Sequence, residues 1–65
     1  MKIPKDVKDQ VKKQRLTMLQ NRYYNFHLDY ISLKNMGDEK RADECKTEMD
    51  KIEVAYKIVE AENTE

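Results

Sequence analysis

Apolar side chains recur along this chain at the spacing of a helix face that packs against another helix. Two ladders of six positions each advance by alternating steps of three and four residues, which is typical of the contact line between paired helices. The first ladder is Leu16, Leu19, Tyr23, Phe26, Tyr30 and Leu33, and the second is Ala42, Cys45, Met49, Ile52, Tyr56 and Val59. The pattern therefore predicts two helices.

A single glycine separates the two ladders. Gly37 is predicted to end the first helix in a left-handed C′ position, and Asp38 to cap the second helix. Pro4 fits the first helical turn, because its missing N–H would have no helical partner there. The predicted helices run from about residue 4 to 36 and from about 38 to 61, with the turn at 37–38 and a frayed tail at 62–65.

The two ladders are mirror images about the turn. The numbers of facing residues add up to 75, from Leu33 opposite Ala42 to Leu16 opposite Val59. An antiparallel hairpin has this symmetry. The predicted fold class is all-α, with residues 1–65 forming one helical-hairpin domain.

A second apolar set lies off the contact line on each helix. Its members are Tyr24, Leu28 and Ile31 on the first helix, and Val54, Ile58 and Ala61 on the second. The two sets are predicted at opposite ends of the hairpin, so they are not expected to meet within one chain. In an antiparallel two-fold dimer, a four-helix arrangement, each set would cover the other set of the partner. The alternative is that they are ordinary scattered surface hydrophobic residues.

The small size of the chain also favours self-association. A chain of 65 residues buries only about 60% of its unfolded surface, so domains of this size often need a disulfide, a metal or a partner. The single cysteine excludes an intramolecular disulfide, and Cys45 with His27 offers too few ligands for zinc. Oligomerisation is then the remaining source of the extra stability that a chain of this size needs.

Charge is divided unequally between the helices, although the formal net charge is zero. Residues 1–37 hold eight Lys/Arg against three Asp/Glu, a difference of +5, and residues 38–65 hold five against ten, a difference of −5. Mutual attraction of two solvated helix faces explains this division most simply.

Part of the first helix is expected to extend beyond the second, and it carries much of the basic charge. The basic residues that could contact phosphates are Lys5, Lys8, Lys12, Lys13, Arg15 and Arg22, with Tyr24 as a stacking face.

The residues give no indication of catalysis. Cys45 lies on the second ladder near Glu44 and Glu48, which predicts a buried, inert thiol. His27, beside Phe26, is predicted to be a partly exposed interface residue that could add pH sensitivity. We therefore expect no enzyme activity, catalytic residue, cofactor, metal or small-molecule substrate. With no long apolar run, we also expect no membrane partner and a cytoplasmic protein.

The stretch Ala42-Asp43-Glu44-Cys45 is similar to an Ala-Asp-x-Cys stretch of the Rop family, whose members are four-helix bundles built from two hairpins. The resemblance covers the layout and these four residues, whereas the core steps further along the chain differ, so no functional residue is carried over. It implies RNA binding through the basic first helix. From the residues themselves we expect a protein-interaction module, acting as an inhibitor, adaptor or assembly factor, with itself or a larger protein as partner. A nucleic-acid-binding regulator is the alternative.

Overall fold

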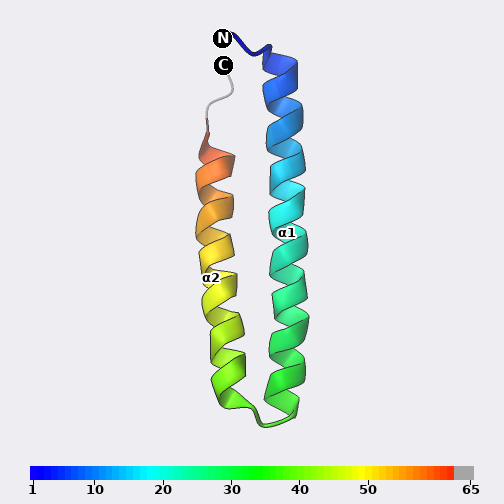
Figure 1. The fold of residues 1–65 in the computed structure, drawn as a ribbon, viewed down its shortest axis with the longest axis vertical. Coiled ribbons are helices and arrows are strands. Elements are labelled where there is room, and N and C mark those ends of the chain that lie inside the picture. The colour runs from blue at the N-terminus through cyan, green and yellow to red at the C-terminus, as the bar shows by residue number, and fades with distance from the viewer. Residues whose placement is uncertain (63–65) are drawn as a thin grey trace.

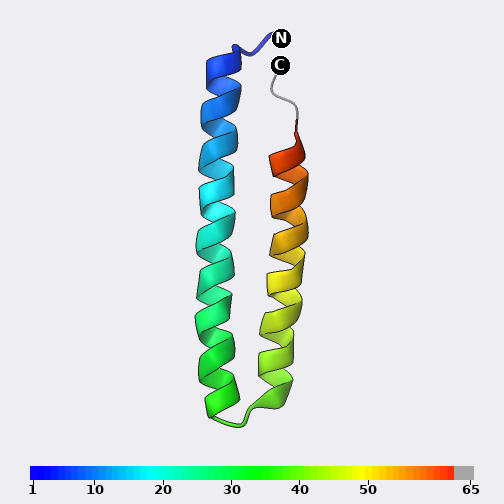
Figure 2. The same cartoon turned by 180° about the vertical axis from the view of Figure 1, so that it is seen from behind.

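The chain forms two α-helices joined by a short turn at residues 36–38 (Figure 1). In this computed structural model, which describes residues 1–62, α1 spans Lys5–Asn35 and α2 spans Glu39–Ala61. The helices pack antiparallel as a hairpin, side by side in opposite views (Figures 1 and 2). The predicted all-α hairpin is confirmed. No helix among the described residues is long and apolar enough to cross a bilayer.

Gly37 ends α1 in the left-handed conformation that the sequence predicts, with φ of +78°. Its N–H donates to the carbonyl oxygen of Lys34 at 3.1 Å, and the N–H of Asp38 donates to the carbonyl oxygen of Leu33 at 2.9 Å. This pair of bonds is the Schellman motif, which satisfies carbonyl groups left without partners at a helix C-terminus. The motif reverses the chain within three residues.

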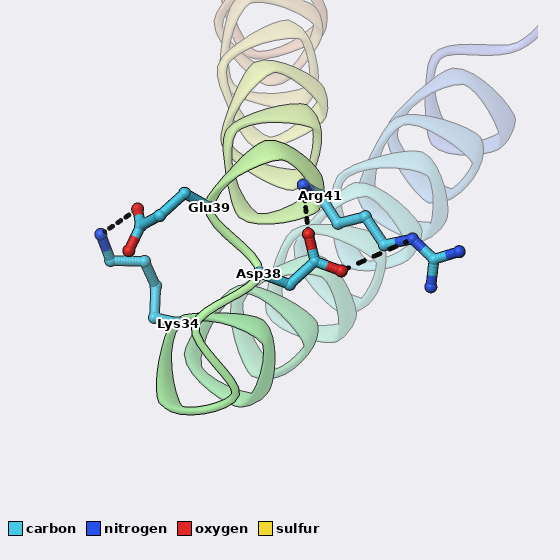
Figure 3. A network of polar contacts seen from close by, with 4 residues as sticks. All are labelled: Lys34, Asp38, Glu39 and Arg41. Carbon is cyan, nitrogen blue, oxygen red and sulfur yellow. Dashed lines mark hydrogen bonds and ion pairs between the residues drawn. The ribbon is translucent and has the colours of Figure 1, made fainter.

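Asp38 also begins α2, as predicted, by capping its first turn (Figure 3). Its carboxylate accepts a hydrogen bond from the Arg41 backbone N–H at 3.2 Å and lies 3.7 Å from Arg41 Nε. On the other side of the turn, Lys34 Nζ donates to Glu39 Oε2 at 2.8 Å, and this contact raises the pKa of the Lys34 ammonium. The turn is therefore fixed by backbone geometry and by side chains from both helices.

The start of α1 differs by one residue from the prediction. Pro4 is the N-cap and not a residue of the first turn, with φ −56° and an extended ψ of 147°. Its carbonyl oxygen accepts the first helical bond, from the Lys8 N–H at 3.1 Å, but its ring offers no oxygen to cap the free N–H groups. Asp6 lies in the first turn, at the positive end of the helix dipole.

The core is the predicted contact line between the helices. Four of its members are buried, namely Leu19, Ala42, Met49 and Ile52. The other ladder residues are half-buried, except Tyr23, whose side chain lies at the rim with 37% exposure. Two bonds between the helices fix the register, from Gln20 Nε2 to Tyr56 Oη at 3.3 Å and from Lys12 Nζ to the Glu62 carbonyl oxygen at 2.8 Å.

The start of α1 extends beyond the end of α2 (Figure 1). α1 has 31 residues and α2 has 23, a difference of roughly 12 Å at 1.5 Å per residue. Because Lys12 bonds at the level of Glu62, the turns of α1 before Lys12 form this extension. The mirror register of the two ladders would place Thr64 opposite Val11, but Thr64 and the rest of the tail at 63–65 lie outside the described residues.

One pair of helices leaves the molecule elongated and its surface large. The radius of gyration is 15.5 Å, against about 11 Å for a compact domain of this length. The accessible surface is 5450 Å², against about 4,400 Å² for a folded monomer of this mass. The hairpin therefore exposes about 1,000 Å² more than a compact monomer would.

Candidate functional site

The apolar set on α1 lies on the side of the helix that faces away from α2. Leu28 lies midway between the ladder residues Phe26 and Tyr30, two residues from each, so it projects from the opposite side at about 100° per residue. Tyr24 is 59% exposed, and Leu28 and Ile31 are exposed to a similar degree. The structure thus leaves these three predicted interface residues open.

The apolar set on α2 is exposed as well. Val54, Ile58 and Ala61 all lie outside the contact line, and Ile58 is 66% exposed. Charged residues flank this set, and one close pair lies beside Val54, where Lys57 Nζ is 3.4 Å from a Glu53 carboxylate oxygen. The surroundings of the α2 set are therefore charged.

A groove of about 500 Å³ lies where α1 extends past α2. We call it the open-end groove, and its lining residues are Ile3, Val7, Lys8, Val11, Lys12, Arg15, Ile58, Val59 and Glu62. The sequence did not predict this groove, to which Ile58 and Val59 of α2 contribute together with Val7 and Val11 of α1. The mirror register could have indicated it, because it places Lys12 close to the end of α2.

Three of the six predicted basic contact residues come together at this groove. Lys8, Lys12 and Arg15 line it, and Lys12 is held by its bond to the Glu62 carbonyl oxygen. The other three, Lys5, Lys13 and Arg22, are exposed but do not line it. The groove therefore combines apolar walls with a cluster of positive charge.

A second groove, of about 580 Å³, runs between the helices nearer their middle. We call it the tyrosine groove, and its lining residues are Leu19, Gln20, Tyr23, Tyr24, Ile52, Glu53, Tyr56, Lys57 and Glu60. Gln20 and Arg15 are five residues apart, about 140° around α1, and flank the contact line on opposite sides. The two grooves accordingly open on opposite faces of the hairpin.

The structure does not bring Tyr24 to the basic cluster. Tyr24 lines the tyrosine groove, whereas Arg15 lines the open-end groove. Nine residues separate them, which is roughly 13 Å along the helix axis. The tyrosine ring stacks instead on His27, with ring centroids 6.1 Å apart. A nucleic-acid site that combines these cations with Tyr24 stacking is therefore not assembled within one hairpin.

Cys45 is half-buried rather than fully buried as predicted. Removal from water raises the pKa of its thiol, and the carboxylates of Asp29, Glu44 and Glu48 raise it further. The thiolate is the nucleophilic form of cysteine, so this environment disfavours reaction. His27 is also half-buried. Within residues 1–62, no cluster of three or more His, Cys, Asp or Glu residues is arranged to hold a metal ion.

Comparison of the chain with protein-family models, curated proteins and solved structures found no match in any of the three.

Proposed function

We propose that this protein is a small interaction module that acts through the apolar faces of its helices, with itself or a larger protein as partner. The proposed contact residues are Tyr24, Leu28 and Ile31 on α1, and Val54, Ile58 and Ala61 on α2. The cellular role that fits such a module is that of an inhibitor, adaptor or assembly factor, with no catalysis of its own.

The observation that carries this proposal is the excess of exposed surface. The described chain buries only four hydrophobic residues, while twelve large ones remain exposed. Isolated exposed hydrophobic residues are normal, but contiguous ones on a monomer are typical of interaction sites. An interface of ordinary size takes about 800 Å² from each partner, which is close to the surface excess of this hairpin.

The proposal is tested by replacing one apolar contact residue and, as a control, one exposed residue outside the proposed contact. Leu28→Glu places a charge in the centre of the α1 set, whereas Lys40→Glu changes an exposed charge near the turn. Light scattering behind a sizing column should show that Leu28→Glu lowers the association state and that Lys40→Glu does not. If Leu28→Glu changes neither self-association nor the binding of a partner protein, the proposal is wrong.

Nucleic-acid binding is a second candidate, supported by the grouping of Lys8, Lys12 and Arg15 at the open-end groove. Binding through three phosphate contacts should weaken about 40-fold between 50 and 200 mM salt, because counterions are released on binding. Apolar helix docking should change little over the same range. A salt titration with a labelled RNA hairpin therefore separates the two candidates, and Lys8→Glu with Arg15→Glu should abolish only the nucleic-acid activity.

A further inference from the structure

One side of α1 carries no charge from its beginning to its end. Ten positions follow one another at alternating steps of four and three residues, the spacing of a helix-packing line. Nine of them lie in α1, and the first, Ile3, precedes its N-cap Pro4. We call them the uncharged stripe, and they are Ile3, Val7, Gln10, Gln14, Thr17, Asn21, Tyr24, Leu28, Ile31 and Asn35. In a chain with 40% charged residues, an outward-facing side normally carries charge.

The equivalent side of α2 does carry charge. The corresponding positions on that helix are Lys40, Asp43, Thr47, Asp50, Val54, Lys57 and Ala61. Four of these seven are charged, as expected of a helix side in water. The lack of charge on α1 is therefore a property of that helix and not of both.

All ten residues of the uncharged stripe are exposed. The apolar residues fall in two groups, with Ile3 and Val7 near the start of α1, and Tyr24, Leu28 and Ile31 towards its end. Between the groups lie four uncharged polar side chains, from Gln10 to Asn21. The stripe thus has apolar ends and a polar centre.

We infer that the uncharged stripe is covered by the same stripe of a second copy of this chain, with the two α1 helices antiparallel about a two-fold axis near the level of residues 15 and 16. This inference rests on the proposed function and narrows it, because it assigns self-association to α1 and leaves the α2 set for a larger protein partner. The pairing places Val7 beside the partner's Tyr24, and Leu28 at the start of the partner's α1, next to Ile3, which precedes that helix. Ile31 and Asn35 extend past the start of the partner's α1. The central polar side chains then face one another and can exchange hydrogen bonds.

Charge favours this partner over the α2 surface. If the α1 set packed on the partner's Val54, Ile58 and Ala61, the ion pair of Lys57 and Glu53 would be drawn towards the interface. Removing such charges from water costs more than the contact returns unless they are well paired. The uncharged stripe of the partner carries no charge, so packing against it avoids this cost.

Charge also selects the antiparallel direction. A parallel pair would place Lys5, Lys8, Lys12 and Lys13 next to their own copies at one end of the dimer, where like charges repel. In the antiparallel pair this basic part of α1 lies beside the partner's second half, which is less basic because it holds Asp29 as well as Arg22 and Lys34. The helix dipoles are then opposed as well.

The available area suits a dimer of ordinary size. The hairpin exposes about 1,000 Å² more than a compact monomer of its mass, and a specific interface takes about 800 Å² from each partner. In the antiparallel pair, residues 5–26 of the two α1 helices lie side by side, a length of roughly 33 Å. One isologous contact of this length can therefore cover part of the excess surface.

Three glutamate substitutions test the pairing, because all three positions are exposed and the helix content can be checked by circular dichroism. By sedimentation velocity, Val7→Glu and Leu28→Glu should each weaken the dimer at least 100-fold, whereas Val54→Glu should leave it intact. If Val54→Glu dissociates the dimer as Leu28→Glu does, the α2 set is the interface; the pairing inferred here is then wrong, although the proposed function stands. A wild-type chain that stays monomeric also overturns the pairing.

Cross-linking tests the direction without altering stability. In a Cys45→Ser background, Gln14→Cys lies close to the axis and should give a covalent dimer with a short bis-maleimide. Asn35→Cys, whose copies would be roughly 58 Å apart along the antiparallel pair, should not. Cross-linking of Asn35→Cys as well as Gln14→Cys would show a parallel pair and overturn the inference.

Discussion

Lys12 Nζ donates a hydrogen bond to the carbonyl oxygen of Glu62 at 2.8 Å, and this bond joins α1 to the residue that ends α2. Together with the bond between Gln20 and Tyr56 it fixes the register of the hairpin. It also marks the point beyond which α1 has no helical neighbour among residues 1–62. The start of α1 is therefore helical surface that a partner can use.

Gly37→Ala should destabilise the hairpin through the backbone alone. A Cβ at this position would meet no atom within 4 Å, so the cost is that of holding an L-residue at φ of +78°, about 1–2 kcal/mol. Urea denaturation followed by circular dichroism measures this difference in the free energy of unfolding. Gly37→Asn should cost less than Gly37→Ala, because asparagine tolerates this conformation better. Equal stability of Gly37→Ala and the wild type would show that the turn is not held in this form.

Asp38→Ala should lower the free energy of unfolding by about 1 kcal/mol, since the Arg41 backbone N–H loses its acceptor. Asp38→Asn is the matched variant, because its amide oxygen can still cap the helix while the ion pair with Arg41 is lost. Both side chains of that ion pair are exposed, so Asp38→Asn should remain close to the wild type. Thermal denaturation distinguishes these outcomes, and a large loss in Asp38→Asn would assign the stabilisation to charge instead of capping.

Ile52→Ala should strongly lower the free energy of unfolding, because Ile52 is 5% exposed in a core of few buried residues. The expected cost is about 3 kcal/mol from lost burial and the cavity left behind. Ile58→Ala removes the same atoms from an exposed position and should cost no more than about 0.5 kcal/mol. Similar losses in both variants, measured by urea denaturation, would contradict the assigned contact line.

The Cys45 thiol should react slowly with iodoacetamide at neutral pH. Burial and neighbouring carboxylates raise its pKa, so less thiolate is present, and the rate should rise only at a pH above the ordinary range of a free cysteine. Asp29→Asn should shift this profile back towards lower pH, and unfolding in urea should restore ordinary behaviour. A profile in the folded protein that matches the unfolded chain would show that the thiol is not perturbed.

The contact line was predictable from sequence because helix packing depends on spacing that single residues display. The alternating steps identified every core position, and the glycine with the following aspartate identified the turn. Tyr23 is more exposed than its ladder position suggests, and its side chain lines the tyrosine groove. Pro4 was misplaced by one residue, since a proline fits both the N-cap and the first turn.

The grooves depend on the relation between the two helices and were harder to predict. Ile58, Val7 and Val11 line one groove because α1 extends past the end of α2. Tyr24 and Arg15 are likewise separated because they line grooves on opposite sides of the contact line. Each helix alone indicated an apolar set, but only the packed pair shows which residues share a groove and which stay apart.

Sedimentation equilibrium of the wild-type chain, over a hundredfold range of concentration and in moderate salt, tests the central claim most directly. The account predicts a species of twice the chain mass of 7.8 kDa, with little dependence on salt, because uncharged surfaces form the contact. A species that keeps the single-chain mass up to millimolar concentration would contradict it.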